Sequence, residues 1–160
     1  MLNRKIKTYD DALDFVKDLF DGVVDKGGNP YIEHLVAVSN GVDSEEEKIC
    51  GLLHDVLEDT YITEHDLEEI GIQRNIIDAI KLVSRNPDET YNAFIDRIIK
   101  SKNTMALKVK LADLNHNSDI SRITNSTEKD YRRVEKRYKP AKEKIIKKIK
   151  GVGGNLINEY

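Results

Sequence analysis

The feature that most constrains this chain is an apolar helical run that ends in charged side chains, in the stretch GLLHDVLEDT (residues 51–60). Leucine and valine recur here at helical spacing, which places the stretch beside a hydrophobic core. The same stretch offers one imidazole and three carboxylates, from His54, Asp55, Glu58 and Asp59. If the helix continues through it, residues four apart share a face, with His54 over Glu58 and Asp55 over Asp59.

Such a cluster predicts a metal site. Buried carboxylates repel one another, and a divalent cation relieves that repulsion. The adjacent side chains of His54 and Asp55 can reach one point, as a nitrogen and an oxygen ligand. The alternative is a solvated acidic helix end, in which the charges need no partner. The apolar residues around the cluster favour the metal site.

The rest of the chain favours an all-α fold. Only nine Gly and three Pro occur among the 160 residues, and apolar residues recur at helical and not at alternating spacing. Residues that cap helices, such as Thr8, Ser44 and Thr63, precede several of the apolar runs. We predict one domain over residues 1–150, an all-α bundle of about seven to nine helices, and a flexible tail at residues 151–160. The expected helices include those over about 9–21, 31–40, 75–84, 89–101 and 128–150.

The composition also excludes some classes of protein. No apolar stretch reaches the roughly 20 residues that a membrane helix requires, and no signal-like apolar segment follows the basic N-terminus. The single Cys50 cannot form an internal disulfide, and its place in an apolar run predicts a small buried hydrophobe. We therefore expect a cytoplasmic protein with no membrane partner.

The charge is unevenly distributed. The net charge is −3, yet residues 129–150 hold 11 basic and 3 acidic residues. Such a segment either contacts nucleic acid or covers an acidic part of the same molecule. We favour the second interpretation, so no nucleic-acid partner is expected. The expected assembly is a monomer or a weak homo-oligomer.

Two further residues complete the candidate metal site. His34 lies on the apolar face of the expected helix over residues 31–40, where a lone histidine is ordinarily a core residue unless partners are present. Asp113 interrupts an apolar helix in VKLADLNHNSD (residues 109–119), four residues before Asn117. The alternative for Asp113 is a surface ion pair with Lys110 or an arginine, worth at most about 1 kcal/mol.

These residues predict one divalent metal ion per chain. Two nitrogens and two oxygens form a mixed ligand set that suits Mn²⁺, Fe²⁺ or Zn²⁺. An ion in such a site polarises a phosphoryl oxygen and lowers the pKa of a bound water. Glu58 and Asp59 are then the candidate acid and base. The predicted ligands are His34, His54, Asp55 and Asp113.

The order His, His-Asp, Asp resembles the HD-domain phosphohydrolase superfamily, and three stretches narrow the resemblance to RelA/SpoT-type alarmone hydrolases. KGGNPYIEH (residues 26–34) is similar to their KxGxPYIxH, and HDVLEDT (54–60) to their HDxxEDT. KLADLNHN (110–117) is similar to their KLADRLHN. The resemblance spans about residues 12–123. It implies a small alarmone hydrolase without the synthetase domain of the full-length enzymes.

The resemblance also implies a reaction and roles for individual residues. The reaction is Mn²⁺-dependent removal of the 3′-pyrophosphate from (p)ppGpp, which degrades the alarmone of the stringent response. By matching position, Glu58 and Asp59 activate water, and Lys26 and Asn117 hold phosphate or ribose. Asp25 stands where these enzymes commonly carry an arginine against the guanine base. We therefore expect weaker binding of highly charged tetraphosphates, and restoring arginine at this position should lower KM for ppGpp.

Two alternatives stay open. One is a hydrolase of the same kind that acts on another nucleotide or on NADPH. The other is a non-catalytic nucleotide-binding module that signals through a partner. That module would be expected to lack a metal ligand or the Glu58–Asp59 pair, and the chain has both.

Overall fold

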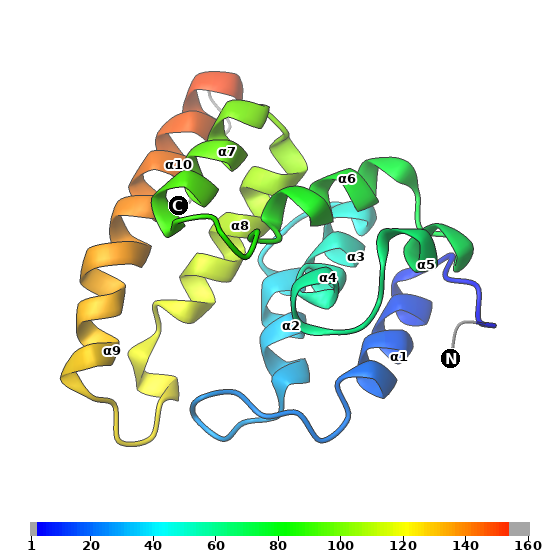
Figure 1. Cartoon of the computed structure of the whole chain (residues 1–160), viewed down its shortest axis with the longest axis horizontal. Coiled ribbons are helices and arrows are strands. Elements are labelled where there is room, and N and C mark those ends of the chain that lie inside the picture. Colours follow the sequence, from blue (N-terminus) through cyan, green and yellow to red (C-terminus); the bar gives the residue numbers. More distant parts are fainter. Residues whose placement is uncertain (1–2, 154–160) are drawn as a thin grey trace.

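The computed structural model describes residues 3–153, which fold into a bundle of helices (Figure 1). The predicted all-α fold is confirmed, because the described residues contain no β-structure beyond one isolated bridge between Val24 and Pro30. The helices are α1 (Tyr9–Leu19), α2 (Tyr31–Asn40), α3 (Glu45–Leu53), α4 (Val56–Asp59), α5 (Glu64–Glu69), α6 (Arg74–Val83), α7 (Tyr91–Ser101), α8 (Thr104–Asn117), the 3₁₀ turn η1 (Ile120–Arg122), α9 (Glu128–Arg133), the π-helical segment η2 (Val134–Tyr138) and α10 (Lys139–Gly153).

The predicted caps begin their helices. Thr8, Ser44 and Thr63 each accept a hydrogen bond from the backbone amide three residues on, and the acidic side chain at that position bonds back to the cap. These reciprocal bonds satisfy amides that have no partner within the helix. Most boundaries fall within two residues of the predicted ones, and the first helix ends at Leu19 and not at residue 21.

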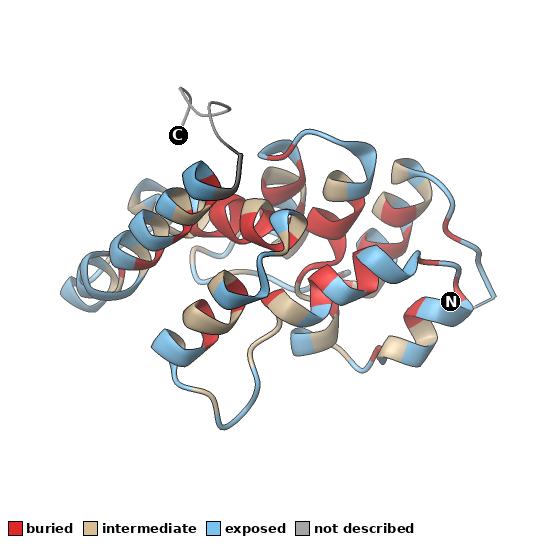
Figure 2. Cartoon of the chain, turned by 90° about the horizontal axis from the view of Figure 1, so that it is seen from above, coloured by how far each residue is buried: buried red, intermediate tan, exposed pale blue. Residues whose placement is uncertain are grey.

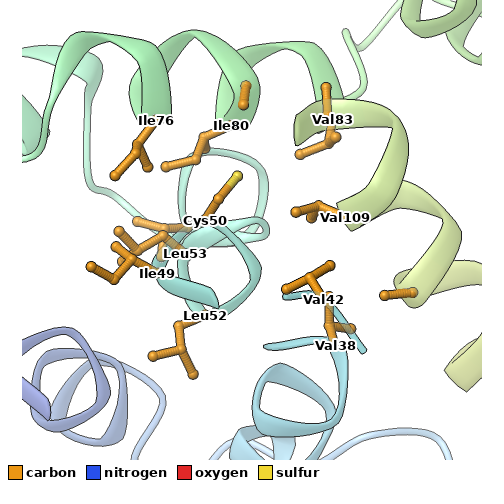
Figure 3. Close-up of a cluster of buried hydrophobic side chains, with 14 of the residues drawn as sticks. Val38, Val42, Ile49, Cys50, Leu52, Leu53, Ile76, Ile80, Val83 and Val109 are labelled. Carbon is orange, nitrogen blue, oxygen red and sulfur yellow. The ribbon is translucent and has the colours of Figure 1, made fainter. Parts of the chain in front are cut away.

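Helices α2, α3, α6 and α8 surround the core, and Figure 3 shows the side chains that fill it. Gly51 in α3 allows α2 to approach closely, since a Cβ there would lie 2.9 Å from the Cα of Ser39. Cys50 is fully buried, and burial raises the pKa of its thiol well above the ordinary value. The thiol therefore behaves as the small hydrophobe that was predicted.

Helices α9 and α10 follow one another without a loop, but their hydrogen-bond pattern changes in the π-helical segment η2 between them. Figure 1 shows α9 and α10 running along one side of the molecule. Between them, the amide of Lys139 bonds to the carbonyl of Val134, five residues back. Pro140 explains this wider turn, because proline has no amide hydrogen and its ring clashes with the carbonyl four residues earlier.

The ends of the chain add two observations. Helix α10 extends to Gly153, so the first residues of the predicted tail are helical, and residues 154–160 lie outside the described part. Figure 2 shows that burial is concentrated in the helices around α8, while the outer side of α9 and α10 is exposed. Within residues 3–153, no helix combines the length and the apolar character needed to cross a membrane.

Candidate active site

The histidine and aspartate of the HD stretch lie in a break between two helices. Helix α3 ends at Leu53 and α4 begins at Val56, so the prediction of an uninterrupted helix is wrong. Asp55 has φ −98° and ψ 0°, which departs from helical geometry and bends the chain. Its Oδ2 accepts a hydrogen bond from the Tyr31 hydroxyl at 2.5 Å. This tertiary contact turns the carboxylate toward α2.

The break brings the four predicted ligand residues together. His54 Nε2 lies 3.1 Å from Asp55 Oδ2 and 3.6 Å from Asp113 Oδ1. His34 Nε2 lies 3.7 Å and 3.2 Å from the same two oxygens. His34, His54 and Asp113 are only 4%, 2% and 6% exposed. Helix α2, the α3–α4 break and helix α8 therefore bring the buried side chains of His34, His54 and Asp113 within 4.8 Å of one another. The half-buried carboxylate of Asp55 lies beside both histidines.

The other ring nitrogen of each histidine has a partner that sets its orientation. His54 Nδ1 lies 2.7 Å from the carbonyl oxygen of Gly51 and donates to it. His34 Nδ1 lies 2.7 Å from His116 Nδ1. Burial, with help from Arg122 and His34, lowers the pKa of His116 to about 4, so its neutral ring accepts from His34. Both Nε2 atoms consequently face the cluster.

Asp113 is held by two further residues of α8. Its Oδ2 accepts from Lys110 Nζ at 2.7 Å, and its Oδ1 accepts from Asn117 Nδ2 at 2.8 Å. The alternative of an ion pair between Lys110 and Asp113 is correct about the partner. It is wrong about the location, because the two side chains are only 10% and 8% exposed and the pair is not on the surface. Asn117, predicted to bind substrate, orients the oxygen that faces the histidines. Its substrate contact stays a prediction.

The cluster is suited to a cation. Burial opposes a charge on His54, but the carboxylates of Asp55 and Asp113 outweigh it and raise the pKa of this histidine well above 6.5. His54 Nε2 is fully buried and has no hydrogen-bond partner of suitable geometry among the described residues. A buried nitrogen without a partner is costly. The residues present therefore fit a divalent metal with mixed nitrogen and oxygen ligands.

The predicted acid and base lie on α4, beside the cluster. Burial, followed by nearby carboxylates, raises the pKa of both Glu58 and Asp59 above the ordinary value. Asp59 also lies 3.4 Å from the Tyr31 hydroxyl. Burial and then Asp55 raise the pKa of Tyr31, so this hydroxyl stays protonated and donates. Raised pKa values favour proton uptake by these two half-buried carboxyls, as an acid or a base in catalysis requires.

A cavity of about 360 Å³ opens over the cluster. Seven of the eight predicted site residues line it, and His54 lies beneath. Part of its wall is cationic, formed by Arg85 from the α6–α7 loop and by Arg133 and Arg137 from α9 and η2. Sequence reasoning missed these arginines, and the available signal for Arg133 and Arg137 was the basic composition of residues 129–150. Two arginines of that segment thus face the acidic site, as expected for a segment that covers it.

A second cavity, of about 320 Å³, adjoins the first. The loop before α2, η1 and α9 enclose it, with apolar side chains from Val24, Ile120, Ile123 and Val134. The two cavities share lining residues, so they form one continuous cleft. These shared residues are Lys26, Tyr31, Asn117, Arg133 and Tyr138.

Asp25 does not point freely into this cleft. Its Oδ1 accepts from the amides of Gly27 and Asn29 at 2.8 and 3.0 Å. Its Oδ2 lies 3.3 Å from Arg122 Nη1. The expectation that Asp25 repels phosphates rested on an unpaired carboxylate, whereas this one is paired and closes a turn of its own loop.

Comparison with protein-family models finds no match. Among curated proteins, the chain is 34% identical over 113 residues to a guanosine-3′,5′-bis(diphosphate) 3′-pyrophosphohydrolase of Haemophilus influenzae, covering 63% of this chain and 17% of that protein. Among solved structures, it matches one described as a metazoan orthologue of SpoT that hydrolyses ppGpp and plays a role in starvation responses. That match has a TM-score of 0.69 and 21% identity, and covers 92% of this chain and 88% of the other.

The helical fold and the buried histidine–aspartate cluster resemble those of HD-domain proteins. Within that class the chain is RelA/SpoT hydrolase-like, in its sequence and in its fold. It spans only 17% of the length of the curated relative that it matches.

Proposed function

We propose that this protein is a metal-dependent phosphohydrolase that removes the 3′-pyrophosphate from (p)ppGpp. The observation that carries the proposal is the meeting of His34, His54, Asp55 and Asp113 within 3.1–3.7 Å at the floor of a cleft with a cationic wall. The carboxylates at the floor of the cleft need a cation to offset their charge. The cationic wall favours an anionic substrate. The similarity to the Haemophilus influenzae pyrophosphohydrolase supports the same reaction.

The metal would be held by His34, His54, Asp55 and Asp113, and we propose Mn²⁺ ahead of Fe²⁺ or Zn²⁺. When bound, such an ion supplies a polarised phosphoryl oxygen and a water of lowered pKa. Lys110 and Asn117 orient the carboxylate of Asp113, and Gly51 orients His54. These contacts keep the ligand atoms in place before the substrate arrives.

The remaining residues of the cleft have distinct roles in this proposal. Glu58 takes a proton from the attacking water, and Asp59, held by the Tyr31 hydroxyl, supplies one to the leaving group. Both roles suit carboxyls whose pKa values lie above the ordinary range. Lys26 and Arg133 line both cavities, where they would hold the phosphates that join the reacting end of the substrate to its nucleoside.

The nucleoside would occupy the second cavity, which has apolar walls and two tyrosines at its junction with the first. A planar base can pack on such walls while its phosphates face Lys26 and Arg133. We also propose that the protein works in the cytoplasm as a monomer or a weak homo-oligomer, and that nucleic acid is not its partner.

The test is a substrate panel with Mn²⁺, comprising ppGpp, GTP, ATP and NADPH, with orthophosphate and pyrophosphate measured separately. The expected result is pyrophosphate from ppGpp and much slower release from the others. Orthophosphate from NADPH, or release from a different nucleotide, would instead identify the alternative hydrolase. Tight nucleotide binding without any release would identify the signalling module.

A further inference from the structure

Arg122 joins three parts of the cleft. It ends η1, and its Nε and Nη2 donate to the carbonyl oxygen of His116 at 3.2 and 3.0 Å. Its Nη1 lies 3.3 Å from Asp25 Oδ2, in the loop before α2. One guanidinium therefore links the end of α8, whose His116 ring contacts the candidate ligand His34, to the loop that walls the second cavity.

The loop is shaped to receive this guanidinium. Asp25 uses Oδ1 for the amides of Gly27 and Asn29, which leaves Oδ2 for Arg122. Asn29 Nδ2 adds a contact of 3.4 Å to the carbonyl oxygen of Arg122. Only glycine fits at position 27, because a Cβ there would lie 2.5 Å from that same oxygen. Figure 1 shows the loop and the segment after α8 meeting at the lower edge of the molecule.

The residue that this contact places is Lys26. It lines both cavities, next to Arg133. Lys26 is exposed, and desolvation followed by the charge of Arg133 lowers the pKa of its amine, while Asp130 acts in the opposite direction, so repulsion from Arg133 is only partly offset. A surface loop with exposed glycines would relax away from such repulsion. The Asp25–Arg122 pair, with side chains 17% and 24% exposed, opposes that movement.

We propose that Arg122 is a positioning residue which, with Asp25, latches the loop of residues 21–30 so that Lys26 faces the substrate phosphates. The kinetic effects expected of this latch rest on the proposed function. In the latch Asp25 supports substrate binding, whereas its place in the motif suggests that it weakens binding. The aspartate holds the loop closed through an arginine on the far side of the cleft, and does not act on the substrate itself.

The sign of one substitution separates these two roles. If Asp25 merely repels the substrate, Asp25→Arg lowers KM for ppGpp. If Asp25 is the latch, the same substitution places two arginines together, removes the acceptor for the two loop amides and raises KM. A lowered KM for Asp25→Arg overturns the proposal.

A double-mutant cycle tests the pair itself, using Asp25→Asn, Arg122→Gln and both together. Asparagine keeps an acceptor for the loop amides and loses the charge. We expect each single variant to raise KM for ppGpp by about tenfold, and the double variant to be no worse than either. Arg122→Lys, which keeps the charge opposite Asp25, recovers most of the affinity. The matched control is Arg132→Gln, which breaks the exposed pair between Arg132 and Glu128 and leaves KM unchanged.

Readouts other than KM separate the latch from a general structural role and from failure of the proposed function. The latch predicts an unchanged kcat and metal content, with faster hydrogen exchange at the amides of Gly27 and Asn29 in both single variants. Exchange needs no substrate, so it decides the latch even if wild-type protein releases nothing from ppGpp. Additive losses in the cycle, unchanged exchange, or Arg122→Lys as impaired as Arg122→Gln each overturn it.

Discussion

The two cavities that form the cleft are adjacent, but different forces hold their walls in place. The metal cluster comes from α2, the α3–α4 break and α8, whose packing around the core fixes three of its four ligands at no more than 6% exposure. The second cavity comes from a loop, a 3₁₀ turn and an exposed helix, joined mainly by the Asp25–Arg122 pair. Hydrophobic packing is non-directional and strong in sum, whereas a partly exposed ion pair is weak and specific. The first region should therefore keep its geometry when the second loses it.

The largest effect is expected from Glu58→Gln, which removes the proposed base and leaves the ligand set intact. Turnover of ppGpp should fall by about 10²–10⁴-fold, the usual contribution of a general base. Metal content should stay near that of wild type, because Glu58 is assigned to the water. His54→Ala, as the comparison variant, should lose both. Substantial activity in Glu58→Gln would refute the acid–base assignment, and equal metal loss in both variants would make Glu58 a ligand.

Lys110→Met tests whether burial distinguishes the metal region. The side chain of Lys110 is 10% exposed and lies 2.7 Å from Asp113 Oδ2 and 4.9 Å from the centre of the Phe94 ring. Methionine keeps the packing but leaves the carboxylate without its cation, which typically costs about 3–5 kcal/mol of unfolding free energy. Urea denaturation of metal-free protein measures the loss.

Lys108→Met is the matched control for that experiment. Lys108 lies two residues earlier on α8 and pairs with Glu47 at 3.0 Å, but it is 24% exposed. Its loss should be about 1 kcal/mol or less, because water screens the pair. Equal losses for the two lysines would show that burial does not set the stability of this region.

The metal cluster, which is built from packed helices, is easier to predict from the sequence than the second cavity, which is built from a loop and a turn. The candidate ligand residues lie in short motifs within or next to apolar helices, so periodicity and spacing could predict them. The break at Asp55 escaped notice because HDV contains no helix breaker, and the Tyr31 hydroxyl that binds Asp55 there is 24 residues away in the sequence. Arg133 and Arg137 reach the cleft through the path of the chain after α8 and the π-turn before Pro140. No local pattern encodes either, although Pro140 could have indicated a change in the helix.

Removing the metal should affect the two regions unequally. A ligand that binds only the native state adds RT ln(1 + [L]/Kd), about 2.7 kcal/mol at a hundredfold excess over Kd. We expect EDTA to lower the melting temperature of protein that was shown to hold Mn²⁺. Exchange at the amides of Gly27 and Asn29 should stay unchanged, since Asp25 holds them without the metal. A melting temperature that does not respond to EDTA would contradict the proposed metal site.

Acid should affect the metal site before it affects the loop that walls the second cavity, although the metal site is the more deeply buried of the two. Metal binding requires neutral histidine, and the carboxylates of Asp55 and Asp113 raise the pKa of His54, so Mn²⁺ should be released as the pH falls and His54 takes up a proton. Burial raises the pKa of Asp25, but the amides of Asn29 and Gly27 and then Arg122 outweigh it, so the net shift is below 3.8. A lowered pKa contributes stability that is complete above the unfolded value of 3.8 and is lost as the pH falls through the folded value.

Bound Mn²⁺ measured by electron paramagnetic resonance should therefore disappear while the loop amides are still protected. Their protection should decline only below pH 3.8. Loss of loop protection together with the metal would show that the metal, and not the Asp25–Arg122 pair, holds the second cavity closed.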